Sequence, residues 1–204
     1  MYTVVALSSF LFVFAGILSV VLGGELLTAL SAVSYGLIDF LWHQCDYGGA
    51  ETRCHFSKIY YMGLLGKLDS FFQHTLIVYT LTSILFSTKI FLMLSRSLIT
   101  WTSFFLILSH KINGEQADLI TTGMYLGLWI VSHILHQHPP RRLEWTALLF
   151  VSFALGYFML QVTRIVRDET VQGICICVAH VSFSFGVVCA ALCLRVTKTV
   201  KKKK

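Results

Sequence analysis

Seven long apolar segments dominate the 204-residue chain, and they constrain its fold more than any other feature. Each has roughly the 17–25 residues that a tilted membrane-spanning helix needs. Only 13% of the residues are charged, against about 25% in soluble domains. We therefore predict an all-α polytopic membrane protein, a single bundle of seven transmembrane helices over residues 1–204. The predicted spans are Thr3–Leu22, Leu26–Gln44, Leu64–Phe86, Ile90–Leu108, Asp118–Leu135, Trp145–Val166 and Gly173–Leu194.

The basic residues favour one orientation of these spans. Lys and Arg accumulate in the cytoplasmic loops of membrane proteins. With the N-terminus outside, most of the basic residues fall inside, including those of a short cytoplasmic tail at 195–204. Arg96 interrupts the fourth span near its cytoplasmic end, where we expect its guanidinium to snorkel to the membrane surface.

The tail supplies much of the net charge of +6 and predicts contact with lipid. Lys198, Lys201, Lys202, Lys203 and Lys204 can each attract anionic lipids of the cytoplasmic leaflet by about 1 kcal/mol. The terminal lysines also resemble a dilysine retrieval signal, so the plasma membrane and the early secretory pathway are both open as locations. Nucleic-acid binding is not expected, because no segment resembles a soluble domain that would carry it.

Ionisable side chains at membrane depth are the main functional candidates, since such groups are costly and rare there. Asp39 and His43 lie four residues apart, on one face of a helix, with Asp69 in the next span and His180 in the last. The two histidines are candidate zinc ligands, which carboxylates commonly orient. A catalytic zinc takes three protein ligands, and Cys177 is a candidate third. Alternatively, these groups form hydrogen bonds that hold the helices together.

The cysteines divide into two sets. Cys45 and Cys54 border the predicted outer loop, where an oxidising environment favours a disulfide between them. The other four lie in the last span, where small apolar packing residues are expected: Cys175, Cys177, Cys189 and Cys193. Cys193, close to the cytoplasmic lysines, is alternatively a palmitoylation site.

Other histidines are not expected to join the cluster. His133, His136 and His138 adjoin Pro139 in a predicted cytoplasmic turn, far from the outer half of the bundle. His74 follows Asp69 by more than one helical turn, and we expect it to form a hydrogen bond inside the bundle.

The stretch His43-Gln44-Cys45-Asp46, followed by Cys54 and Asp69, resembles the signature of the myomaker-like family. That family belongs to a seven-span, hydrolase-like superfamily that includes alkaline ceramidases and adiponectin-type receptors. The resemblance implies that His180 matches the last patterned histidine of the family. Two departures stand out. The superfamily hydrolases have Ser where this chain has Asp39, and His where it has Ile176, so one expected zinc histidine is missing.

These observations rank three functions. The first is a myomaker-like protein that promotes membrane remodelling or cell–cell fusion, in contact with lipids, copies of itself or other fusion proteins. The second is a zinc-dependent lipid amidase or esterase, with His43 and His180 as ligands and Asp69 or Asp39 as catalytic carboxylates. The third is a receptor or scaffold without chemistry. The missing histidine places the enzyme second, and zinc is expected at an incomplete site.

Overall fold

The computed structural model describes residues 2–46, 58–86, 88–108 and 143–201, together with 123, 124, 127, 130–132 and 134. All regular structure in these residues is helical, as the sequence predicts. The helices are α1 (Tyr2–Ser8), α2 (Phe10–Val21), α3 (Leu26–Asp46), α4 (Lys58–Leu85), α5 (Lys89–Leu108), α7 (Leu143–Ile165) and α8 (Glu169–Lys201).

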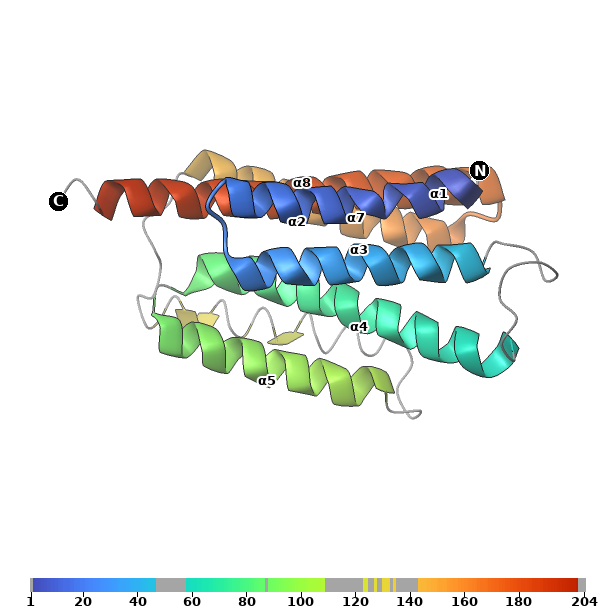
Figure 1. The fold of residues 1–204 in the computed structure, drawn as a ribbon, viewed down its shortest axis with the longest axis horizontal. Coiled ribbons are helices and arrows are strands. Elements are labelled where there is room, and N and C mark those ends of the chain that lie inside the picture. Colours follow the sequence, from blue (N-terminus) through green and yellow to red (C-terminus); the bar gives the residue numbers. More distant parts are fainter. Residues whose placement is uncertain are drawn as a thin grey trace.

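The helices run roughly along one common direction and form a bundle (Figure 1). Helix α8 packs against α7 and contacts α1, α2, α3 and α4, whereas among the described helices α5 contacts α4 alone. The two ends of the chain lie at opposite ends of the bundle. The core holds aromatic and aliphatic side chains of five helices, including Phe12, Tyr35, Leu76, Leu149 and Val187.

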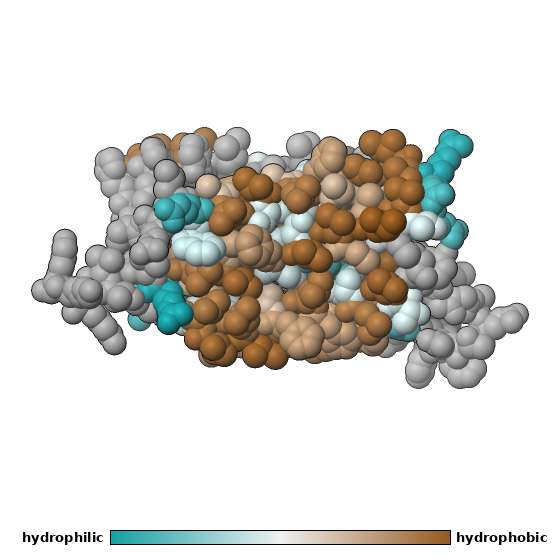
Figure 2. All heavy atoms as spheres, turned by 90° about the horizontal axis from the view of Figure 1, so that it is seen from above, coloured by the Kyte–Doolittle hydropathy of each residue, from teal (hydrophilic) through white to brown (hydrophobic). Residues whose placement is uncertain are grey.

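Five helical stretches are long and apolar enough to cross a membrane, as expected for an integral membrane protein. They are Thr3–Val21, Leu26–Gln44, Lys89–Ile107, Glu144–Ile165 and Glu169–Arg195. On the face drawn in Figure 2, apolar side chains cover the middle of the molecule and hydrophilic ones lie towards its two ends. This distribution suits a molecule surrounded by lipid, because apolar side chains face hydrocarbon at no cost in hydration.

The remaining two predicted spans have different outcomes. The third corresponds to α4, whose 28 residues reach about 42 Å, but it is not among the five apolar stretches. Its polar side chains are turned into the bundle, where His74, Thr75, Thr80 and Thr82 are all buried. The fifth, Asp118–Leu135, falls largely outside the described residues.

The first predicted span is a nearly continuous rod with one tightened turn. We predicted a single helix over Thr3–Leu22, whereas α1 and α2 meet at Ser9. Ser9 keeps helical dihedral angles, but its N–H donates to the carbonyl of Ala6, and its own carbonyl accepts from Phe12. Both bonds span three residues instead of four, which is the pattern of a 3₁₀ turn. The tightened turn changes the direction in which Ser8 and Ser9 project.

The prediction for Arg96 is wrong. Its side chain does not snorkel to the surface; it is only 4% exposed and forms an ion pair with Glu25. Glu25 follows Gly23, whose φ of +83° lets the chain turn sharply from α2 into α3. That turn sets the carboxylate at the depth of Arg96. Since the two residues are 71 positions apart, the partner could not be identified from the span containing Arg96.

Candidate metal centre

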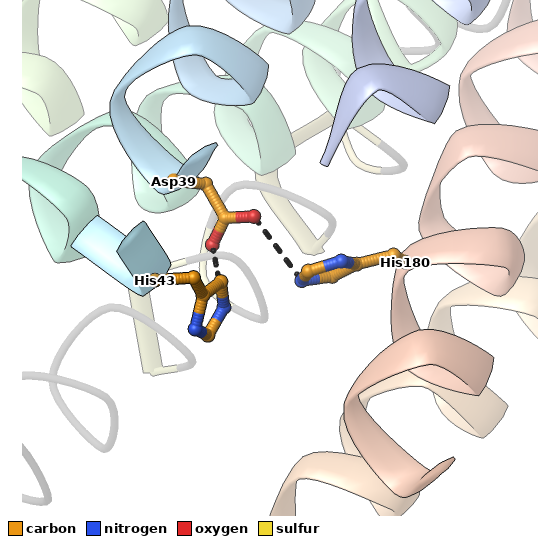
Figure 3. A group of neighbouring side chains, drawn as sticks. All are labelled: Asp39, His43 and His180. Carbon is orange, nitrogen blue, oxygen red and sulfur yellow. Dashed lines mark ion pairs between the residues drawn. The ribbon is translucent and has the colours of Figure 1, made fainter. Parts of the chain in front are cut away.

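Three buried side chains from two helices converge in the bundle. Asp39 and His43 come from α3 and His180 comes from α8, and their exposed fractions are 2%, 6% and 2%. The Asp39 carboxylate lies between the two imidazoles (Figure 3). Its Oδ1 is 3.3 Å from Nε2 of His43, and its Oδ2 is 3.3 Å from Nε2 of His180. One candidate ligand atom from each residue lies within 4.8 Å of the others.

The helix geometry explains how these side chains meet. Asp39 and His43 occupy one face of α3, because residues four apart in a helix lie one above the other. On α8, His180 packs edge-on against the ring of Phe12, with ring centroids 5.3 Å apart. Phe12 also packs against Tyr35, with ring centroids 4.6 Å apart. These rings form an apolar wall beside the polar cluster, which strengthens electrostatic interactions within it.

Hydroxyl groups surround the cluster, and the sequence analysis missed them. Ser8 Oγ lies 2.8 Å from Nδ1 of His180 and also donates to the carbonyl of Val5, at 2.6 Å. Ser9 donates to Oδ2 of Asp39, and Tyr35 donates to Oδ1 of Asp39 over a long 3.5 Å. The available signal was a pair of adjacent serines in an otherwise apolar run, but nothing in the sequence says which helix they face.

Asp69 lies beside the cluster, on α4. Its side chain forms a hydrogen bond with Asp39, and its Oδ1 is buried without a hydrogen-bond partner among the described residues. The sequence analysis grouped Asp39 and Asp69 with the two histidines, named both carboxylates as catalytic candidates, and gave neither as a metal ligand. The structure instead brings Asp39 into the three-residue group, with Asp69 next to it.

The other predicted site residues are not brought into the group. Cys177 is partly buried and is not part of it, and Ile176 is a buried apolar residue. Cys193 is buried with its Sγ 3.7 Å from Oγ1 of Thr146, as a packing residue would be. His74 contacts the carbonyl of Ser70 through Nδ1 at 2.7 Å, which confirms the expected bond within the bundle.

Two further predictions lie outside the described residues. Cys54 is not described, nor is the side chain of Cys45 in the last turn of α3, so their disulfide stays a prediction. The tail residues Lys202, Lys203 and Lys204 are also outside.

The geometry of the cluster fits a zinc ion. Zinc binds His nitrogen and carboxylate oxygen at roughly 2.0–2.2 Å in tetrahedral sites, which sets the ligand atoms about 3.3–3.5 Å apart. Oδ1 of Asp39 lies 3.3 Å from His43 and Oδ2 lies 3.3 Å from His180, while one ligand atom from each of the three residues lies within 4.8 Å of the others. Two histidines and one carboxylate are also a ligand set of catalytic zinc sites, with the fourth position left for water. Asp39 is thus a candidate third ligand, in place of the Cys177 that the sequence analysis named.

No protein-family model, curated protein or solved structure matches this chain. The resemblance to the myomaker-like family therefore stays a prediction.

Proposed function

We propose that this protein is a seven-span, zinc-dependent hydrolase of lipid amides or esters, with the fold of the superfamily that it resembles. The observation that carries the proposal is the group of Asp39, His43 and His180, three buried residues whose candidate ligand atoms lie within 4.8 Å of one another. The sequence ranked membrane remodelling above hydrolysis because a third ligand was missing. Asp39 reverses that order, because it can take the place of the absent histidine.

The direction of the helices supports seven spans. Helix α5 ends at the same end of the bundle as the N-terminus, whereas α7 begins at the other end (Figure 1). The chain from residue 109 to residue 142 therefore has to connect opposite ends of the bundle. A crossing there, the fifth in chain order, adds to the five apolar stretches and to α4, which is the third. The total is then seven, and the two chain ends lie on opposite sides of the membrane.

The residues of the centre would have different roles in hydrolysis. Asp39, His43 and His180 would hold the ion. A bound zinc supplies a Lewis acid and lowers the pKa of a bound water towards 7. Asp69 offers its buried, unpartnered Oδ1 as the atom that takes a proton from the attacking water. Phe12 and Tyr35 keep bulk water from the inner side of the centre.

Metal analysis of the purified protein in lipid nanodiscs tests the proposal. We expect about one zinc per chain, lost in His43→Ala and His180→Ala. His74→Ala is the matched control, because His74 is a buried histidine that contacts a backbone carbonyl outside the cluster. A panel of ceramides and phospholipids should reveal hydrolysis that His180→Ala abolishes and His74→Ala retains. Wild-type protein without zinc after loading would overturn the proposal.

Membrane remodelling is the second candidate function, and one observation favours it. The Asp39 carboxylate contacts Ser9, His43 and His180, so it ties together the first span, α3 and α8 without any metal. Hydrogen bonds of this kind hold transmembrane helices together. A fusion assay in cells that display the protein at their surface separates the two candidates. Content mixing that survives His180→Ala, with no lipid hydrolysis, would favour remodelling.

A further inference from the structure

The tightened turn at Ser9 brings two adjacent hydroxyls to two different residues of the metal centre. Ser8 reaches His180, and Ser9 reaches Asp39. Gly36 makes the close approach possible, because a Cβ there would lie 2.8 Å from the carbonyl oxygen of Ser9. The first span therefore packs against α3 almost backbone to backbone at this point, which fixes where both hydroxyls lie.

The hydrogen bonds of Ser8 determine which nitrogen of His180 carries the proton. A serine hydroxyl has one proton to donate, and a backbone carbonyl can only accept. Because Ser8 Oγ is 2.6 Å from the carbonyl oxygen of Val5, it gives its proton to that carbonyl. Its oxygen must then accept from Nδ1–H of His180, at 2.8 Å. A neutral imidazole has only one N–H, so Nε2 of His180 carries a lone pair.

That lone pair points at another acceptor. Nε2 of His180 lies 3.3 Å from Oδ2 of Asp39, and this oxygen already accepts a hydrogen bond from Ser9. Two acceptors that face each other in a buried site repel unless a cation lies between them. A metal ion is bound by both lone pairs at once, which makes the arrangement favourable.

We propose that Ser8 is a positioning residue of the metal centre, which holds His180 in the Nδ1–H tautomer so that Nε2 is directed at the ion. This inference rests on the proposed function. An outer hydrogen-bond partner of this kind commonly fixes the tautomer and ring orientation of a ligating histidine. The same bond argues against a serine nucleophile, since the Ser8 proton is directed away from the imidazole.

Nitrogen-15 NMR of the histidines in metal-free protein tests the tautomer directly. We expect the His180 signals, identified by their loss in His180→Asn, to report Nδ1–H in the wild type. In Ser8→Ala the imidazole can turn its proton to Asp39, so the Nε2–H form should grow. Wild-type His180 in the Nε2–H form would overturn the inference without any measurement of activity.

Zinc affinity gives the second readout. Ser8→Ala should weaken zinc binding about 10–100-fold, as the loss of such outer partners does, and Ser8→Thr should restore it. Ser31→Ala is the matched control, because Ser31 donates to the carbonyl three residues before it, as Ser8 does, but does not touch the centre. Equal zinc affinity of Ser8→Ala and wild type would overturn the inference. Zinc-free wild type would overturn the proposed function instead. The NMR measurement of the His180 tautomer would then still test the role of Ser8.

Discussion

Two polar clusters lie about 21 Å apart along α3. They differ in whether the hydrogen-bond donors and acceptors of each cluster match. In the first cluster, Arg96 donates through both terminal nitrogens to Glu25. Its Nε also donates to Thr82 at 3.0 Å, and Nη2 donates to the carbonyl of Tyr79 at 2.8 Å. The guanidinium additionally lies over the Tyr79 ring, 4.6 Å from its centroid. Charge and hydrogen bonds are both satisfied.

The second cluster, around Asp39, has too many acceptors. Oδ1 of Asp69 is buried without a partner among the described residues, and Nε2 of His180, an acceptor under the proposed role of Ser8, faces Oδ2 of Asp39. Buried polar groups without partners are costly in a medium of low dielectric constant. The comparison teaches that a buried charge does not by itself indicate a binding site. The Arg96 cluster is complete and joins helices, whereas the Asp39 cluster holds a carboxylate between two imidazoles, the arrangement on which the proposed metal site rests.

The largest effect is expected from a substitution that breaks the ion pair of the Arg96 cluster. Glu25→Leu leaves the Arg96 guanidinium buried without its counter-ion and should destabilise the protein by about 3–5 kcal/mol. Thermal unfolding in nanodiscs measures this loss. The double variant Glu25→Leu/Arg96→Met removes both charges and should recover most of the stability. Zinc content should stay at the wild-type level in the double variant. A double variant as unstable as the single one would show that the pair is not the source of the effect.

The next largest effect concerns Asp69 in the second cluster and tests whether it acts as a base or as a ligand. Asp69→Asn removes the proposed proton acceptor but not a ligand, so lipid hydrolysis should fall about 100-fold or more while zinc content is unchanged. The turnover rate and metal content of the same preparation provide the two readouts. Loss of zinc in Asp69→Asn would instead make Asp69 a ligand, and the division of roles between the two carboxylates would be wrong.

The smallest effect concerns the packing that places the serines. In Gly36→Ala the new methyl group would meet the carbonyl of Ser9 at 2.8 Å and the Cβ of Phe12 at 3.0 Å, neither of which can move freely. We expect a loss of about 1–3 kcal/mol in stability, together with weaker zinc binding. Gly66→Ala is the control, because its methyl group would meet only the ring of Trp42, at 3.1 Å. Similar zinc affinities in the two variants would show that the α2–α3 contact at Gly36 does not affect metal binding.

The features that the sequence predicted depend on spacing within one helix. Apolar length predicted seven spans, of which five match helical stretches long and apolar enough to cross a membrane, and a separation of four residues put Asp39 and His43 on one face. The features that it missed depend on which helices meet and at what depth. The pairing of Arg96 with Glu25 and the contact of Ser8 with His180 join residues 71 and 172 positions apart. Neither contact has a local pattern, because both follow from how separate helices pack.

The role of Asp39 was missed for a related reason. A pattern based on known hydrolases assigns ligands by residue type, so it counted the histidines and found one absent. A carboxylate one turn before His43 can offer a ligand in place of that histidine, but only the approach of α8 shows that it lies within reach of His180. The chemistry of a site is thus set by which atoms come within reach of one another, and a substitution in one helix can be offset by a residue in another.

Helix α8 connects the buried centre to the end of the bundle at which the chain ends. It has 33 residues and spans about 50 Å, which exceeds the roughly 30 Å of hydrocarbon in a bilayer. It contains no proline, the commonest cause of a sharp kink in a helix. Lys201 lies about 31 Å along the axis from His180. A tilt of about 5° at His180 would therefore shift the basic end of the helix by about 3 Å. A movement of α8 at the centre would thus change the position of its basic end relative to the lipid headgroups.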